Sequence, residues 1–248
     1  MKKIFIIILI GLIAASCSTG SLKKQVSEQV SKEDLTTNAS GSGREITVDF
    51  ASGPSFYYPL IAVWIEQLDS SYVQTLYVSK SVATGIFRYG KQEKNAWVSA
   101  PKRAPQTLPY WSHKRGIVAD DGLYVPDQKT RVPDAYSGAS ATLGFVLHTR
   151  SDSALPQKFR ILLEVNQNWD WNEYWTNDKY PDDENYKYSC QPALVYEAII
   201  DMNSGNDSYE MHPIGHSHYS GKDGKLYTDL STITTALQIA GSIKISVK

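Results

Sequence analysis

Apolar and polar residues alternate over much of the chain from Glu45 onward, and this period of two constrains the fold more than any other feature. The alternation is clearest over residues 46–50, 159–165 and 243–247. Successive side chains of a strand point to opposite faces of a sheet, so the period is typical of strands with one buried face. The chain is therefore predicted to be mainly β, an antiparallel β-sandwich with long loops, with residues 45–248 as a single domain.

Two further segments, residues 62–66 and 72–78, are rich in β-branched and aromatic residues. Residues 68–71, Leu-Asp-Ser-Ser, lie between them and predict a hairpin turn. Trp64 and its alternating neighbours are expected to face the interior of the sandwich. The best helical candidate is residues 84–97, although it contains two glycines. Other strands are expected over residues 144–149, 193–202 and 209–214.

The first sixteen residues have the three parts of a secretory signal peptide. Lys2 and Lys3 precede an apolar run over residues 4–13, and Ala-Ala-Ser follows directly before Cys17. An apolar run of about ten residues is too short to span a bilayer. Small residues ending in a cysteine resemble a lipobox, which implies cleavage before Cys17 and acylation of its thiol. The alternative is an ordinary signal peptide with a chance cysteine.

Residues 17–44 contain Ser, Thr, Gly, Lys and Glu with almost no large apolar side chain, so they are predicted to be a flexible tether. The acyl chains on Cys17 are expected to anchor the protein in the outer membrane, with its folded domain facing the periplasm. Removing Lys2 and Lys3 leaves 23 basic and 26 acidic residues, a formal charge of 23 − 26 = −3. This balance does not favour a nucleic-acid partner.

Two stretches carry a family resemblance. Residues 62–66 with 72–78, and the block Pro-Asp-Ala-Tyr-Ser-Gly-Ala-Ser over residues 133–140, resemble the predicted periplasmic family called domain of unknown function 2271. The resemblance covers roughly residues 46–247. It implies an immunoglobulin-like sandwich in the periplasm, and it brings no established activity.

The block around Ser140 is also similar to the covalent-flavin site of FMN-binding subunits of ion-pumping oxidoreductases. There a hydroxyl in the position of Ser140 is linked to FMN, and Asp134, Ser137 and Gly138 would form its small-residue surroundings. The alternative is a tight turn before a strand, with Gly138 in a left-handed conformation and Asp134 capping a backbone amide.

Three histidines, His212, His216 and His218, are close enough in sequence to suggest a metal site. Imidazoles two residues apart on a strand share a face, so His216 and His218 could bind one ion with His212 as third ligand. Pro213 and Gly215 interrupt the strand, and the alternative is a polar loop with one buried, hydrogen-bonded histidine.

An aromatic segment lies between residues 169 and 188, interleaved with acidic residues. Trp169, Trp171, Tyr174 and Trp175 begin it. Such rings could form a platform for a glycan, or they could close the edge of the core as a folded loop.

The sequence contains no nucleophile motif with a supporting base and no glycine-rich phosphate loop. We therefore expect no catalytic residues and a non-enzymatic binding or accessory domain, whose partner is an envelope protein or a glycan. The alternatives are a flavin carrier through Ser140 and a glycan-binding module through residues 169–188.

Overall fold

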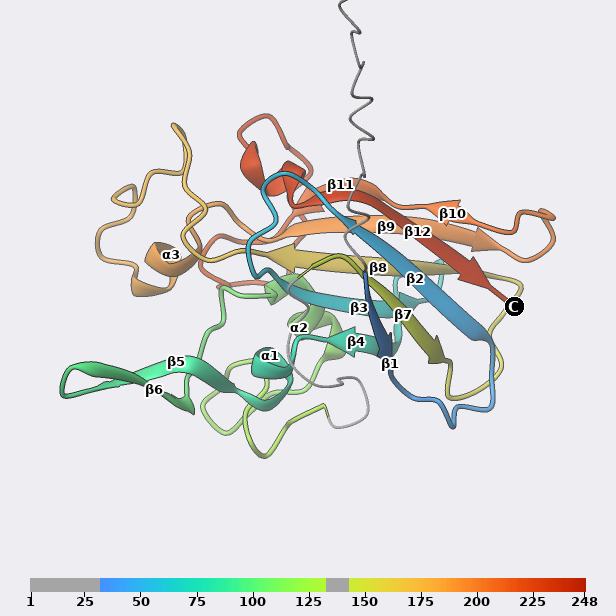
Figure 1. The fold of residues 1–248 in the computed structure, drawn as a ribbon, viewed down its shortest axis with the longest axis horizontal. Coiled ribbons are helices and arrows are strands. Elements are labelled where there is room, and N and C mark those ends of the chain that lie inside the picture. Colours follow the sequence, from blue (N-terminus) through green and yellow to red (C-terminus); the bar gives the residue numbers. More distant parts are fainter. Residues whose placement is uncertain (1–31, 133–142) are drawn as a thin grey trace, which may run out of the picture. The chain divides into compact units, whose positions relative to one another are not determined.

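The computed structural model describes residues 32–132 and 143–248. These residues fold into a β-sandwich of two five-stranded sheets, which confirms the predicted class (Figure 1). The first sheet has the order β1-β7-β2-β12-β10, and the second has the order β11-β9-β8-β3-β4. The strands of the first sheet are β1 (Glu33–Thr36), β7 (Phe145–Arg150), β2 (Glu45–Ser52), β12 (Ala240–Val247) and β10 (Tyr209–Glu210). The strands of the second sheet are β11 (His212–His216), β9 (Leu194–Asp201), β8 (Lys158–Asn166), β3 (Leu60–Glu66) and β4 (Tyr72–Val78). The immunoglobulin-like topology stays a prediction.

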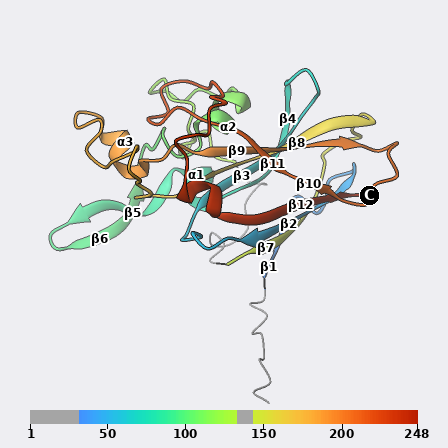
Figure 2. The same ribbon diagram turned by 90° about the horizontal axis from the view of Figure 1, so that it is seen from above.

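Strand β3 of the second sheet is buried on both faces. Val63 of β3 points into the core between the sheets, whereas Trp64 points outward into a second cluster with Leu108 and Trp111. Trp111 belongs to α2 (Pro109–Arg115), which lies on the side of this sheet away from β2 and β12 (Figure 2). The prediction that Trp64 faces the sandwich interior is therefore wrong, because a third layer covers the outer face.

The predicted tether is wrong over its last part, because β1 is a strand of the first sheet. It pairs in parallel with β7, and Leu35 is buried in the core between the sheets. The Thr37 hydroxyl donates to the carbonyl of Leu76 at 2.7 Å, and the Arg150 guanidinium donates to the carbonyls of Gly41 and Gly43. Backbone hydrogen bonds to the open edge of β7 explain why this polar segment is ordered, since every residue except proline offers both a backbone N–H and a C=O.

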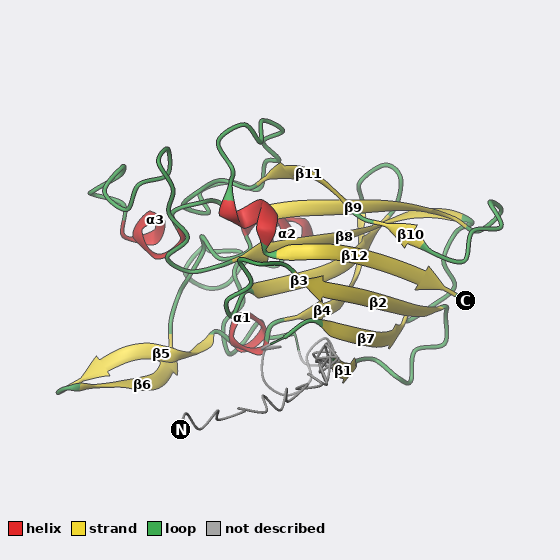
Figure 3. Cartoon of the chain, turned by 45° about the horizontal axis from the view of Figure 1, so that its top comes forward, coloured by secondary structure: helices red, strands yellow, loops and turns green. Residues whose placement is uncertain are grey.

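The predicted helix over residues 84–97 is also wrong. A short helix, α1 (Lys80–Thr84), ends at Gly85, whose φ of 67° is a left-handed cap. The chain then forms a hairpin of β5 (Ile86–Glu93) and β6 (Ala96–Pro101), which stands apart from both sheets (Figure 3). Tyr89 and Trp97 are exposed on it.

The other strand predictions are confirmed, with one difference in the segment 209–214. The chain crosses between the sheets at Met211, so β10 pairs with β12 and β11 pairs with β9. The hairpin turn between β3 and β4 is present, with the Asp69 carboxylate accepting from the backbone N–H of Ser71. The connection from β8 to β9 contains α3 (Glu184–Ser189), and a 3₁₀ helix (Thr235–Gln238) precedes β12.

Candidate functional site

Three of the four predicted platform residues are exposed, on the loop that follows β8. Trp169, Trp171 and Tyr174 are more than half accessible, whereas Trp175 is buried. The loop continues into α3 at the end of the sandwich where β8 ends (Figure 1). Trp175 therefore closes the core as the second alternative expected, whereas a glycan platform formed by the three exposed rings stays a prediction.

Trp175 anchors the loop. Its indole packs against Tyr186 and Tyr219, and its Nε1 donates to the hydroxyl of Thr232 at 3.1 Å. The Asn172 side-chain oxygen accepts from the backbone N–H groups of Tyr174 at 2.9 Å and Trp175 at 2.7 Å. The exposed rings are therefore held on a fixed backbone, which lowers the entropy lost when a ligand binds.

A second loop carries two more exposed rings. Tyr57 and Tyr58 lie between β2 and β3, with ring centroids 5.0 Å apart. The backbone N–H of Tyr57 donates to the side-chain oxygen of Gln167 at 2.7 Å, which ties this loop to the start of the Trp169 loop. The exposed aromatic surface is thus defined by five side chains that are between 52% and 71% exposed: Tyr57, Tyr58, Trp169, Trp171 and Tyr174.

Both loops hold an aromatic residue in the left-handed region of backbone space. Tyr58 has a φ of 50° and Trp169 a φ of 63°. Bulky residues rarely adopt this conformation, which costs on the order of 1–3 kcal/mol per residue and clusters at functional sites. Hydrogen bonds hold the strained backbone, since the Trp169 N–H donates to the Tyr188 carbonyl at 2.9 Å and Asp170 forms a bridge with Cys190.

Asp170, one of several acidic residues in this loop, is not available to a ligand at the surface. Asp170 is buried, and its carboxylate accepts from the hydroxyl of Thr235. Burial raises the pKa of Asp170 above its ordinary value, and the hydrogen bonds from Thr235 and Gln191 oppose that rise. Its role is to fix the base of the loop.

The predicted three-histidine metal site is wrong. His212 is exposed, whereas His216 is buried against Tyr227 and its Nδ1 lies 2.8 Å from the Ser217 carbonyl. The register shift between Pro213 and Gly215 breaks the alternation that would align the rings. Among residues 32–132 and 143–248, no group of three or more His, Cys, Asp or Glu could hold a metal ion.

The proposed flavin segment, with Asp134, Ser137, Gly138 and Ser140, lies outside the described residues. The signal peptide over residues 1–16 and Cys17 also lie outside them. In the part of the chain that the structure describes, no helix has the length and apolar character needed to cross a membrane.

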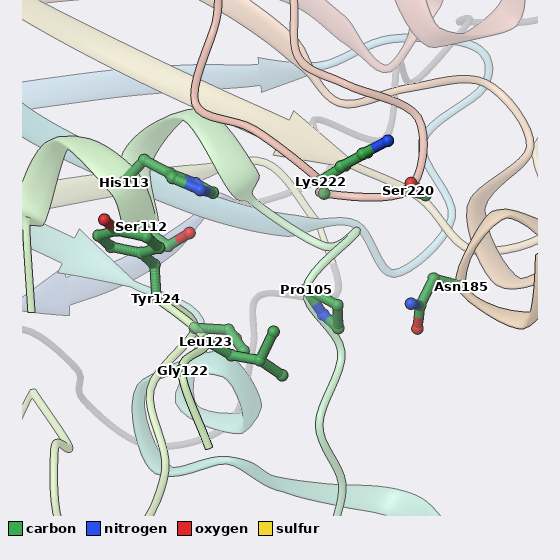
Figure 4. Close-up of a pocket in the computed structure, with 11 residues that line it drawn as sticks. Pro105, Ser112, His113, Gly122, Leu123, Tyr124, Asn185, Ser220 and Lys222 are labelled. Atoms are coloured by element: carbon green, nitrogen blue, oxygen red, sulfur yellow. The ribbon is translucent and has the colours of Figure 1, made fainter. Parts of the chain in front are cut away.

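A pocket of about 380 Å³ was not predicted from the sequence. Its walls come from α2, from residues 122–125, from α3 and from residues 220–222 (Figure 4). These segments are far apart in the chain and share no sequence motif, so no local sequence pattern predicts the pocket.

The chain matches no protein-family model, and no curated protein is detectably similar to it. The resemblance to domain of unknown function 2271 therefore stays a prediction.

Proposed function

We propose that this chain is an envelope lipoprotein whose β-sandwich binds a glycan through the exposed aromatic surface. The observation that carries the proposal is the set of five exposed rings on two loops that are tied together by the Tyr57–Gln167 hydrogen bond. Aromatic faces bind the C–H face of a sugar ring, and Tyr and Trp offer this area with few rotatable bonds.

A glycan is favoured over a protein partner because the loops that carry the exposed aromatic surface expose no large aliphatic side chain. On the described loops 53–59 and 167–183, every exposed large hydrophobic side chain is aromatic, and the exposed aliphatic residues lie elsewhere. Protein interfaces are also enriched in Tyr and Trp, so the lack of exposed aliphatic side chains on these two loops is what favours a glycan. Single-stranded nucleic acid also stacks on rings, but it requires a basic groove, and the mature chain would be acidic.

Trp171→Ala is expected to weaken binding of the cognate polysaccharide about tenfold, because one stacking contact is lost. The soluble chain over residues 18–248 would be screened by affinity electrophoresis against a panel of bacterial and plant polysaccharides, and the dissociation constant then measured by calorimetry. The melting temperature should stay unchanged, since the side chain is exposed.

Trp97→Ala is the matched control, because Trp97 is equally exposed but lies on the β5–β6 hairpin. It should leave glycan binding unchanged. Equal losses in the two variants, or a chain that binds no polysaccharide and captures one envelope protein through Trp171, would contradict the proposal.

Cys17→Ser is expected to move the protein from the membrane fraction to the soluble fraction, because the thiol that carries the acyl chains is lost. The measurement is membrane fractionation with labelled palmitate. Cys190→Ser is the control, since Cys190 is the other cysteine and is buried in the core. Unchanged palmitate incorporation in Cys17→Ser would exclude the anchor.

A further inference from the structure

The pocket beside α3 has one aromatic wall. The rings of His113 and Tyr124 stack with centroids 4.1 Å apart and an angle of 27° between their planes. Figure 4 shows them on one side of the pocket, with Pro105, Ser220 and Lys222 on the other. Stacking holds the two rings in a fixed position, so a ligand in the pocket meets an ordered aromatic wall.

Two glycines fix this geometry. Gly221 has a φ of 73°, and a side chain there would place a Cβ 2.1 Å from the Pro105 carbonyl oxygen. A Cβ on Gly224 would lie 2.3 Å from the Cβ of His113. The loop of residues 221–224 therefore contacts both walls, through Gly221 at Pro105 and through Gly224 at His113, and these contacts fix the spacing of the walls.

The partner of His113 Nδ1 determines which ring nitrogen can bond a ligand. Its Nδ1 lies 2.7 Å from the Pro109 carbonyl oxygen, which can only accept a hydrogen bond. Nδ1 therefore donates to this carbonyl, and Nε2 is the ring nitrogen left to bond a ligand hydroxyl. Ser220 and Asn185 add further polar groups to the lining.

The charge of the lining is positive. Lys222 is exposed at the rim, and none of the described residues that line the pocket is Asp or Glu. Asp223 follows Lys222 in the chain, but its carboxylate accepts from the Tyr227 hydroxyl at 3.0 Å and from the Lys225 N–H at 3.1 Å. Within the described part of the chain, no ion pair joins Lys222 to a carboxylate. An anionic group on a ligand would therefore meet an unpaired ammonium.

Helix α3 links the lining of the pocket to the exposed aromatic surface. Asn185 lines the pocket, and Tyr188 follows three residues later on the same side of the helix. The Tyr188 ring meets Trp169 at a centroid distance of 5.5 Å, and the Lys102 ammonium lies 3.3 Å from its centre. A chain of sugars could thus run from the pocket past Tyr188 to Trp169.

We infer that this pocket binds the terminal sugar of an acidic glycan, a uronic acid whose carboxylate pairs with Lys222. The inference rests on the proposed glycan function and names the substrate class. The sugar ring lies against Tyr124 and His113, while Ser220, Asn185 and the His113 Nε2 bond its hydroxyls. A pocket of this size holds one sugar ring with room for the glycosidic link.

The test uses ¹⁵N-labelled protein over residues 18–248, titrated with sodium D-glucuronate, sodium D-galacturonate and D-glucose. Either uronate should shift the amide signals of Ser220, Gly221, Lys222 and Asn185, and glucose should bind at least about tenfold more weakly. Lys222→Ala should weaken uronate binding about tenfold, since a charge-assisted hydrogen bond is lost. Lys225→Ala, in the same loop but outside the lining, should bind uronate as the unaltered chain does.

Equal binding of glucose and both uronates, or uronate binding that is unaffected by Lys222→Ala, would overturn the inference. If no pocket amide shifts while Trp171-dependent polysaccharide binding persists, the inference fails and the proposed function stands. If the uronate binds in the pocket but no polysaccharide binds through Trp171, the proposed function fails and the pocket is a site for a free sugar acid.

Discussion

Val63→Asp and Trp64→Asp are both expected to prevent stable folding, although these neighbours point to opposite faces of β3. Val63 is fully buried between the two sheets. Trp64 is fully buried under α2, where its ring contacts Tyr110 and its Nε1 donates to Glu66 Oε1 at 2.9 Å. An unpaired carboxylate at either position costs roughly 4 kcal/mol or more, a large part of the stability of a domain of this size.

Val73→Asp is the matched control, because Val73 lies on the adjacent strand β4 and is 37% exposed. It should change the free energy of unfolding by less than about 1 kcal/mol. Soluble yield and urea unfolding distinguish the three variants. A folded, cooperative Trp64→Asp protein would show that α2 does not cover this face in solution.

The same pair of residues shows how far alternation predicts a fold. Strands β2 and β12 bury one face, so every second residue is apolar and the sequence identifies both. Strand β3 reads Leu-Ile-Ala-Val-Trp-Ile-Glu and is buried at every position. A continuous apolar run predicts a strand but does not say what covers each face, because the cover comes from α2, more than forty residues away.

Strand β1 was missed for a different reason. Glu33–Thr36 has one buried apolar side chain, Leu35, and its place in the sheet comes from backbone pairing with β7. Amino-acid composition reports on side chains and not on backbone hydrogen bonds. A polar segment that joins a sheet mainly through its backbone is therefore predicted to be a tether.

The sequence predicts the part of the candidate site that comes from one short segment, but not the part formed by residues far apart in the chain. Trp169, Trp171 and Tyr174 stand out in one short segment, and the structure exposes all three. His113, Tyr124 and Lys222 each have an ordinary local context, and only the packing of the 221–224 loop on α2 brings them together. Strain at Trp169 was also invisible in sequence, because a positive φ is signalled by glycine and not by tryptophan.

Glu164 is expected to make the protein more stable at pH 5 than at pH 9. Its carboxyl group is fully buried on β8 beneath α2, where it accepts from the backbone N–H groups of Trp111 at 2.8 Å and Tyr110 at 3.2 Å. Burial raises its pKa from 4.5 to about 8, and the hydrogen bonds from Trp111, Tyr110 and Ser217 oppose that rise. The folded protein therefore holds a proton that the unfolded chain has already released.

The direction of the pH dependence of stability follows from that difference in bound protons. Between pH 4.5 and about 8, only the folded state is protonated at Glu164, so the free energy of unfolding falls as the pH rises. The contribution is complete below pH 4.5 and lost above pH 8, with a total on the order of 5 kcal/mol. Glu164→Gln does not titrate and should flatten this slope, at a pH-independent cost of about 1–3 kcal/mol, because the amide NH2 cannot accept from one of the two backbone N–H groups.

Urea unfolding of the unaltered chain and of Glu164→Gln at intervals between pH 5 and 9 measures the effect as a difference of slopes, in which the other titrating groups cancel. Glu173→Gln, at an exposed position of the aromatic loop, should keep the slope of the unaltered chain. Parallel curves for the unaltered chain and Glu164→Gln would mean that the buried carboxyl is ionised throughout, and that the N–H groups of α2 outweigh its desolvation.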